Sequence, residues 1–481
     1  MPPVPDTAPR AVDHRRDSAG VVLPSRDDAV VAAASERVGG QAGTRVGGAT
    51  GWWSPVRVVA LLAVLGAFAA LLVQAPCRST NWSSGVYTYG CYSDISALYF
   101  ARGLDVDPNP FTPSGDRPVE YPPLTAAFIG VVAAVVHATV ADDPSERLRR
   151  FADLSMLVLL ACWVLLTVLT ARFARDRPWD AAMVAVAPGI IAAGLVNWDL
   201  FAALFPTAAI LAWRRDRTLL AGVLLGLGGA AKFYPLLILL PVVLVAWREG
   251  RLGAGIRSVL AALAAFAAVN LPAALWAPDQ WREFFVLSQE RGVGYGSAWY
   301  LPFERGWWDP TATLNWLGPA LLAAACVGIA WLAWRAPRPV GPRLLAQLAF
   351  LVVLAFCLAN KVYSPQYVVW LAALYPLAYP RWGPFLIWQA AEVLYTRAIW
   401  LHLLGVTDPG LEIPAWPHAW ATVIRLAAQV WVGWLVAREV LRGGPDPAGG
   451  LEAEHLVEAG RGHPDVDGEP VADRGRGHVD G

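Results

Sequence analysis

The chain has 481 residues with 38 basic and 38 acidic side chains, so its formal net charge is zero. Hydrophobic residues make up 56% of it, charged residues make up 16%, and its mean hydropathy is +0.44. These values are typical of a polytopic membrane protein and exclude an ordinary soluble enzyme. Because no basic field is available to attract a nucleic acid, that class of partner is excluded as well.

Two polar tails, residues 1–56 and 443–481, are rich in Pro, Gly, Asp and Arg and are expected to be disordered. Residues 57–442 between them should form one membrane domain. Its apolar segments lie near residues 57–75, 122–140, 152–171, 180–196, 199–213, 218–231, 234–247, 258–275, 314–334, 344–359, 366–380, 384–402 and 419–437. A spanning helix needs about 20 residues, so the shorter segments are expected to end inside the protein. We predict an all-α fold with about 12 transmembrane helices, within a range of 11–13.

Arginine clusters predict the orientation. They lie near residues 172–177, 214–217, 248–257 and 335–343. The positive-inside rule places these clusters and both tails in the cytoplasm, and it places loops 76–121 and 276–310 outside. The alternation fails once, because two apolar segments, 122–140 and 152–171, separate the first outside loop from Arg172. One of them is therefore re-entrant or interfacial, and the sequence leaves both open.

The first outside loop carries a short predicted helix with a carboxylate at its start. Ser93 is a suitable N-cap and Gly103 a suitable stop, so Asp94 begins a helix that we expect to lie at the membrane interface. There it can face a substrate; the alternative is that it only complements the helix dipole.

The two ends of the same loop carry further candidates. Glu120 precedes Tyr121-Pro-Pro, which directs the chain back into the membrane; its alternative is a solvated carboxylate at the rim. Cys77 and Cys91 share the loop, so a disulfide is plausible on the extracytoplasmic side, with two free thiols as the alternative.

Only two lysines occur in the chain, Lys232 and Lys361, and each opens an aromatic and proline motif that is predicted to lie outside. An ammonium group is a compact charge that suits a phosphate oxygen, and the alternative is anchoring at the membrane interface. Asp199 ends the hairpin tip Asn197-Trp-Asp199 on the same side, where it binds substrate or simply charges a helix end.

Other ionisable residues lie in or near the last apolar segments. Glu392, Arg397 and His402 follow one another at intervals of about five residues, a spacing that does not place them on one strict helix face. Charges inside a membrane are costly and indicate function. His418 near the last outside loop is more simply structural or exposed. The sequence contains no P-loop, His-Glu-x-x-His or Cys-x-x-Cys motif, and no metal site is expected.

Several of these motifs together resemble glycosyltransferase family 87, over roughly residues 57–440. The matching pieces are Asp94, Tyr121-Pro-Pro-Leu124, Asn197-Trp-Asp199, Ala231-Lys-Phe-Tyr-Pro235 and the segment from Asn360 to Trp370. The resemblance implies a GT-C fold and an inverting mannosyltransferase that uses polyprenol-phosphate-mannose on the extracytoplasmic face of the cell membrane. It also implies Asp94 as general base. Loop 276–310 matches no motif, which leaves the acceptor open.

The resemblance implies transfer of a mannosyl residue to a glycolipid or glycan acceptor, and no metal or cofactor is expected. An inverting transfer needs one carboxylate to deprotonate the acceptor, and two lysines can stabilise the departing phosphate. Lys232 and Lys361 are the expected phosphate ligands, and the other candidate substrate-binding residues are Tyr363, Gln366, Glu120, Tyr121 and Asp199. The alternatives are a pentose donor such as arabinofuranose, or a lipid-linked saccharide transporter, whose usual internal repeat is not found.

Overall fold

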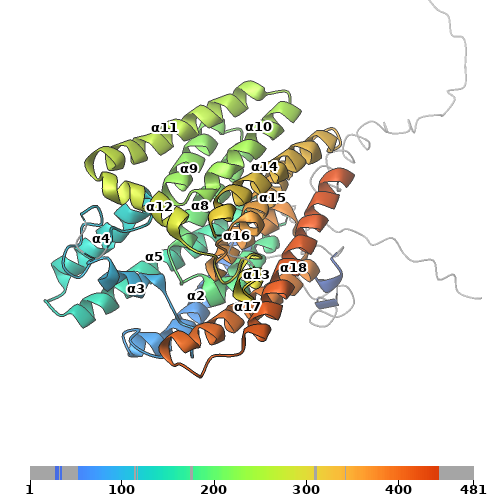
Figure 1. The fold of residues 1–481 in the computed structure, drawn as a ribbon. Coiled ribbons are helices and arrows are strands. Elements are labelled where there is room, and N and C mark those ends of the chain that lie inside the picture. Colours follow the sequence, from blue (N-terminus) through green and yellow to red (C-terminus); the bar gives the residue numbers. More distant parts are fainter. Residues whose placement is uncertain are drawn as a thin grey trace, which may run out of the picture. The chain divides into compact units, whose positions relative to one another are not determined.

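The computed structural model of the protein describes residues 28–31, 33–34, 52–112, 115, 117–173, 177–307, 311–341 and 343–443. Most of the two tails predicted to be disordered, residues 1–56 and 443–481, lies outside this part. The described residues form helices and no strand, which confirms the all-α prediction (Figure 1).

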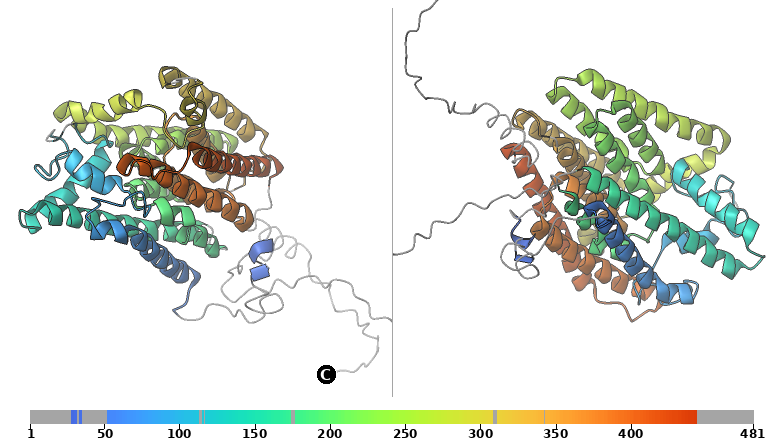
Figure 2. Two further views of the ribbon diagram at one scale, coloured as in Figure 1. Left: turned by 60° about the horizontal axis from the view of Figure 1, so that its bottom comes forward. Right: turned by 180° about the vertical axis from the view of Figure 1, so that it is seen from behind.

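The helices follow the apolar segments with few exceptions. In the first half of the chain they are α2 (Pro55–Ser79), α3 (Asp94–Ala101), α4 (Pro123–Thr139), α5 (Pro144–Phe173), η2 (Pro178–Ala181), α6 (Ala182–Ala185), α7 (Pro188–Ala193), α8 (Asp199–Arg214), α9 (Thr218–Ala231), η3 (Tyr234–Ile238) and α10 (Leu239–Arg248). In the second half they are α11 (Leu252–Trp276), α12 (Pro278–Glu290), α13 (Tyr300–Glu304), α14 (Thr311–Arg335), α15 (Leu344–Ala359), η4 (Pro365–Tyr367), α16 (Val368–Ala378), α17 (Trp382–Thr407) and α18 (Ala415–Arg442). The two further views in Figure 2 show that α17 and α18 run side by side.

Five helices in the described part are long and apolar enough to cross a bilayer: α2, α5, α11, α14 and α18. Several others are apolar but only 10–17 residues long. Long apolar helices in this number make the chain a multi-pass membrane protein. The expected total of about 12 crossings stays a prediction, because many of the short helices could cross only within a protein-lined interior.

The predicted helix over residues 180–196 is instead broken into η2, α6 and α7. Pro178 and Pro188 each begin one of these pieces, as expected for a residue that cannot continue a preceding helix. Gly189 packs so closely against Val368 and Gln389 that a Cβ would meet both side chains. Its N–H donates to the Gln389 side-chain oxygen at 2.8 Å, so tertiary contacts replace the missing helical hydrogen bonds.

The segment predicted as an outside loop, residues 276–310, contains two helices. Pro278 begins α12, whose Phe284 ring stacks on Phe233 at 4.9 Å between centroids. The Gln280 amide donates to the carbonyls of Val119 and Tyr121 at 3.0 and 2.9 Å. These contacts hold α12 over the end of the first loop, and Figure 1 shows it beside α4.

Both ends of α4 lie at the same end of α2 and α5. Arg78 in the last turn of α2 forms an ion pair of 2.7 Å with Asp153 of α5, and Gly66 in the middle of α2 packs against Trp163 further along α5. These two helices are therefore antiparallel, and loop 80–121 extends from their shared end. That loop leads into α4. In the last turn of α4, His137 Nε2 lies 2.8 Å from the carbonyl oxygen of Leu104 in the same loop. The segment that breaks the predicted alternation is therefore 122–140, whereas 152–171 lies in the long helix α5.

The predicted arginine clusters meet at the opposite helix ends. Arg251 pairs with Asp216 at 2.5 Å, and the Arg248 side chain donates to the carbonyl of Ala336. From this end α9 runs against α11 with glycine contacts: the Cα atoms of Gly222 and Gly226 approach the α11 backbone so closely that no side chain would fit. This packing fixes the course of α9 and the position of the lysine that follows it.

The arrangement of α4 predicts a labelling pattern. In a background without the three free cysteines, cysteines at the exposed positions Val106 and Asp142, before and after α4, should react with a membrane-impermeant maleimide from the same side of the membrane. A cysteine at exposed Asp216 should react only from the other side. Labelling of the Asp142 and Asp216 positions from one side would contradict the arrangement.

Candidate active site

The N-terminus of α3 is held against the segment that precedes α8. Ser93 caps α3, and its hydroxyl donates to the carbonyl of Leu195 at 2.8 Å. The backbone N–H of Asp94 donates to the carbonyl of Val196 at 2.7 Å. Asp94 therefore lies beside residues 197–199, and two motifs that are far apart in the sequence form one site.

The Asp94 carboxylate is half-buried among tyrosines and cations. The Tyr121 hydroxyl donates to its Oδ2 at 3.4 Å. Burial raises the pKa of Asp94 to about 6, and the Tyr92 hydroxyl together with the charges of Arg291 and Lys232 opposes that rise. Such a carboxylate is mostly ionised at neutral pH yet accepts a proton readily, which is the balance that a general base requires.

Lys232 and Asp199 form a buried ion pair next to this carboxylate. Lys232 Nζ lies 2.8 Å from Asp199 Oδ1, and the Asp199 side chain is only 1% exposed. The ammonium also lies 5.0 Å from the centroid of the Tyr121 ring and 5.8 Å from that of Trp370. Since Tyr121 contacts both Asp94 and Lys232, it connects the carboxylate to the cation.

Lys361 has different partners. Its Nζ donates to the carbonyl of Gln289 at 2.9 Å and to the Asn315 amide oxygen at 2.6 Å. Burial and the nearby Arg291 charge lower the pKa of Lys361. The two ammonium groups, expected to share one phosphate, thus bind separate residues, because Lys232 is paired with Asp199 and Lys361 is held by oxygens of the 289–315 region.

Arg291 is a further charged residue at this site, and it lies in no recognisable sequence motif. It follows α12 and is exposed, and its charge acts on both Asp94 and Lys361. No motif marks it, and Arg282 and Arg305 occur in the same segment, so the sequence gives no reason to prefer it. Because α12 lies over the end of the first loop, the charge of Arg291 acts on the Asp94 carboxylate.

The remaining predicted substrate-binding residues lie near the site with different degrees of access. The Glu120 carboxylate pairs with Arg102 at 2.7 Å and is mostly buried. Gln366 is buried in η4, next to Tyr367, whose ring stacks on Trp370 at 3.9 Å. Glu120 directly precedes Tyr121 of the Asp94–Lys232 cluster, whereas Gln366 is linked to that cluster only through its neighbour Tyr367 and the Trp370 ring beside Lys232.

Tyr363, expected to line the same surface, is instead buried inside the helix bundle. Its hydroxyl accepts from the Gln429 amide at 2.7 Å, and the Arg425 guanidinium lies 3.8 Å from its ring centroid. Arg425 pairs with Glu392 at 2.8 Å, and both side chains are fully buried. It also donates to the carbonyl of Ser364 at 3.4 Å. The network directs Tyr363 inward and holds the backbone of the lysine motif.

The three ionisable residues predicted inside α17 have three different neighbours. Glu392 pairs with Arg425 of α18. Arg397 donates to the carbonyl of Thr88 in the first loop at 2.8 Å. His402 Nε2 lies 3.6 Å from a carboxylate oxygen of Glu304 in α13. Their spacing along α17 directs them to separate faces, as the sequence indicated, and each face meets a different part of the chain.

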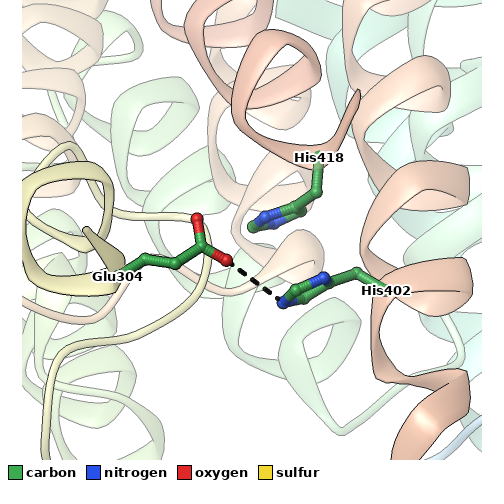
Figure 3. A group of neighbouring side chains, drawn as sticks. All are labelled: Glu304, His402 and His418. Carbon is green, nitrogen blue, oxygen red and sulfur yellow. Dashed lines mark ion pairs between the residues drawn. The ribbon is translucent and has the colours of Figure 1, made fainter. Parts of the chain in front are cut away.

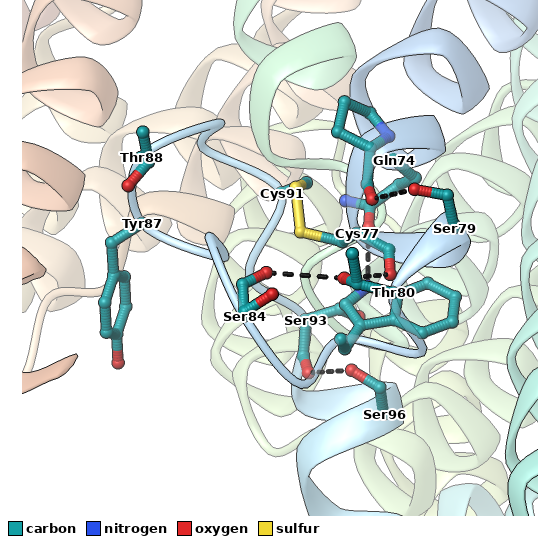
Figure 4. Close-up of a disulfide and its surroundings, with 12 residues drawn as sticks. Gln74, Cys77, Ser79, Thr80, Ser84, Tyr87, Thr88, Cys91, Ser93 and Ser96 are labelled. Carbon is teal, nitrogen blue, oxygen red and sulfur yellow. Dashed lines mark hydrogen bonds between the residues drawn. A yellow bond between two sulfur atoms is a disulfide. The ribbon is translucent and has the colours of Figure 1, made fainter.

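A disulfide fixes the start of the first loop. Cys77 in α2 and Cys91 are joined, which ties the end of α2 to the segment that leads to Ser93 and Asp94 (Figure 4). The Trp82 indole N–H donates to the side-chain oxygen of Gln74 across the same turn at 3.2 Å. The disulfide therefore holds in place the segment that precedes Asp94.

Breaking the buried ion pair should be costly. Arg425→Met leaves the Glu392 carboxylate buried and unpaired, and we expect it to lower the free energy of unfolding by about 3–5 kcal/mol. Arg397→Met, on the exposed face of α17, should cost about 1 kcal/mol or less. Thermal unfolding of both variants in the same detergent checks this; an equal loss in both would contradict the central role of the pair.

No curated protein sequence matches the chain. The model of glycosyltransferase family 87 matches residues 119–360, which is half of the chain and includes Tyr121, Asp199, Lys232 and the stretch up to Asn360. The match begins after Asp94 and ends just before Lys361, so these two residues and the buried Glu392–Arg425 pair lie outside it. The chain belongs to glycosyltransferase family 87, a family of membrane glycosyltransferases.

Proposed function

We propose that this membrane glycosyltransferase transfers a mannosyl residue from polyprenol-phosphate-mannose to a glycolipid or glycan acceptor, with inversion at the anomeric carbon. The observation that carries the proposal is a half-buried carboxylate, Asp94, flanked by the cations Lys232 and Arg291. A transfer from a lipid monophosphate needs one base and a positive field for the leaving group. This cluster supplies both without a metal ion in the transfer step.

Asp94 is the proposed general base. Its carboxylate takes the proton of the acceptor hydroxyl as that oxygen bonds to the anomeric carbon. The bond between this carbon and the phosphate oxygen breaks with its electron pair on the phosphate, so polyprenol phosphate leaves from the opposite face. The Tyr121 hydroxyl, 3.4 Å from Asp94 Oδ2, holds the carboxylate in place.

Lys232 and Arg291 are the proposed ligands of the donor phosphate. Asp199 orients the Lys232 ammonium, while the exposed Arg291 guanidinium is placed to form two parallel hydrogen bonds to a phosphate. Lys361 lies beside Arg291 and adds positive charge. Glu120 and Gln366 are proposed to contact sugar or acceptor.

The cluster is proposed to face the extracytoplasmic side. Loop 80–121, with Asp94, extends from the end of α2 and α5 that carries Arg78 and Asp153. The arginine-rich ends around Arg248 and Arg251 lie at the other helix ends, and the positive-inside rule assigns those to the cytoplasm. A lipid-linked donor reaches such a site from the membrane, at the level of the interface.

Removal of the base should abolish transfer while the protein stays folded. Asp94→Asn keeps the shape of the side chain, and we expect transfer of radiolabelled mannose from polyprenol-phosphate-mannose to fall by about 10²–10⁴-fold. Asp105→Asn in the same loop is the matched control and should retain activity. Asp94→Asn transferring at the wild-type rate would remove Asp94 from the mechanism. If the wild type transfers a pentose from a polyprenol-phosphate donor faster than it transfers mannose, the donor sugar is the pentose.

The pH dependence follows from the raised pKa of Asp94. The ionised form is the base, and protonation removes it, so kcat/KM should decrease as the pH falls through about 6. Above that value it should be level until another group titrates. A profile that shows no decrease between pH 7 and about pH 5 would contradict this assignment.

Substitution of the proposed phosphate ligands should change the KM for the donor rather than the KM for the acceptor. Arg291→Met and Lys232→Met each remove a charged hydrogen bond and should raise the KM for the donor about 10–100-fold. Arg150→Met, an exposed arginine at the same helix ends, is the control and should leave it unchanged. Steady-state kinetics with each substrate varied in turn separate the two effects; an increase in acceptor KM alone would refute the assignment.

A further inference from the structure

Away from the Asp94 cluster, three side chains converge between α13, α17 and α18. Glu304, His402 and His418 each offer a ligand atom, and these atoms lie within 4.8 Å of one another (Figure 3). His402 Nε2 and Glu304 Oε1 are 3.6 Å apart. The two imidazole rings stack with centroids 4.6 Å apart. Two imidazoles and a carboxylate therefore meet at one point from three separate helices.

The histidines lack the partners that buried imidazoles normally have. His418 is fully buried, and within the described part of the chain neither of its ring nitrogens has a hydrogen-bond partner. The same holds for Nδ1 of His402. The Tyr300 hydroxyl lies 3.3 Å from Nε2 of His402, and the rings of Tyr300 and Tyr395 lie next to the His418 ring. Unpaired buried polar atoms are costly, and a bound ion or water is one way in which such atoms are satisfied.

We propose that Glu304, His402 and His418 bind one zinc ion. Two histidines and one carboxylate are a ligand set that zinc takes with a fourth position open. In a tetrahedral site neighbouring ligand atoms are about 3.3 Å apart, given zinc–ligand distances of about 2.0–2.1 Å. The separation of 3.6 Å between His402 and Glu304 is close to that value. The His418 ligand atom lies within 4.8 Å of the other two, so binding of all three to one ion requires a rotation of the His418 ring.

The role of this ion is to fasten the segment that carries Arg291. Glu304 lies in α13, at the end of residues 291–304, whereas both histidines lie on the paired helices α17 and α18. Along the same segment the Tyr295 ring lies 6.0 Å from His402, and the N–H of Gly294 donates to the carbonyl of Lys361 at 2.8 Å. A zinc ion here fixes the far end of the segment whose near end places a guanidinium by Asp94. The ion itself takes no part in the transfer.

The test is to purify the full chain in detergent and to measure its zinc content by inductively coupled plasma mass spectrometry. The chain has seven histidines, and His14, His455, His463 and His478 lie in the tails, where they can bind metal adventitiously. The readout is therefore the difference between variants. His402→Gln and His418→Gln should each lose about one zinc per chain, since removal of a ligand weakens binding by at least about 100-fold. His137→Gln, remote from the cluster, should lose none.

A second measurement needs no variant. Treating the wild-type protein with a zinc chelator should lower its Tm by about 3–5 °C, and zinc sulfate, but not magnesium sulfate, should restore it. This decides the question even where His418→Gln does not fold. Equal zinc content in the wild type and His402→Gln, or a wild-type Tm that the chelator does not change, overturns the proposal.

Discussion

A charge that lies among apolar helices is stable only when an opposite charge compensates it, and two such pairs organise this protein. Glu392 and Arg425 join α17 to α18, and Asp199 and Lys232 join the start of α8 to the end of α9. Each pair lies next to one of the two lysine motifs: Arg425 contacts Ser364 near Lys361, and Lys232 itself begins the other motif. Each buried pair therefore has a second effect besides holding helices together, because it fixes the motif next to it.

The Glu392–Arg425 pair shows how a structural interaction can act on a distant motif. Arg425 reaches the carbonyl of Ser364 and packs on the ring of Tyr363. The chain between Lys361 and Gln366 is thus held from the inside of the bundle. With that backbone fixed, the Tyr367 ring stacks on Trp370, and Trp370 in turn forms one wall around the Lys232 ammonium.

The Asp94 cluster is assembled from helix ends. The start of α3, the start of α8, the end of α9 and the end of α12 each place one charged group there. Helix ends carry unsatisfied backbone groups, which here bond to other segments, as between Asp94 and Val196. Rigid helices then hold four side chains from distant parts of the sequence around one small region. Side chains on a flexible loop would be positioned less precisely.

The sequence by itself determined the class of protein and the local structure. Composition indicated a multi-pass helical membrane protein, the capping residues Ser93 and Gly103 bounded α3 as predicted, and the motifs pointed to the family. These features depend on residues close together in the chain, so their physical causes can be read from the sequence.

Only the tertiary structure decided which distant residues contact one another. It placed both ends of α4 on one side, divided residues 178–193 into short helices, turned Tyr363 inward, and gave Lys232 and Lys361 separate partners. It also let the charge of Arg291 act on Asp94, and it brought Glu304 to two histidines. Hydropathy and spacing describe one segment at a time, whereas a charge or an imidazole takes its role from whichever distant helix packs against it.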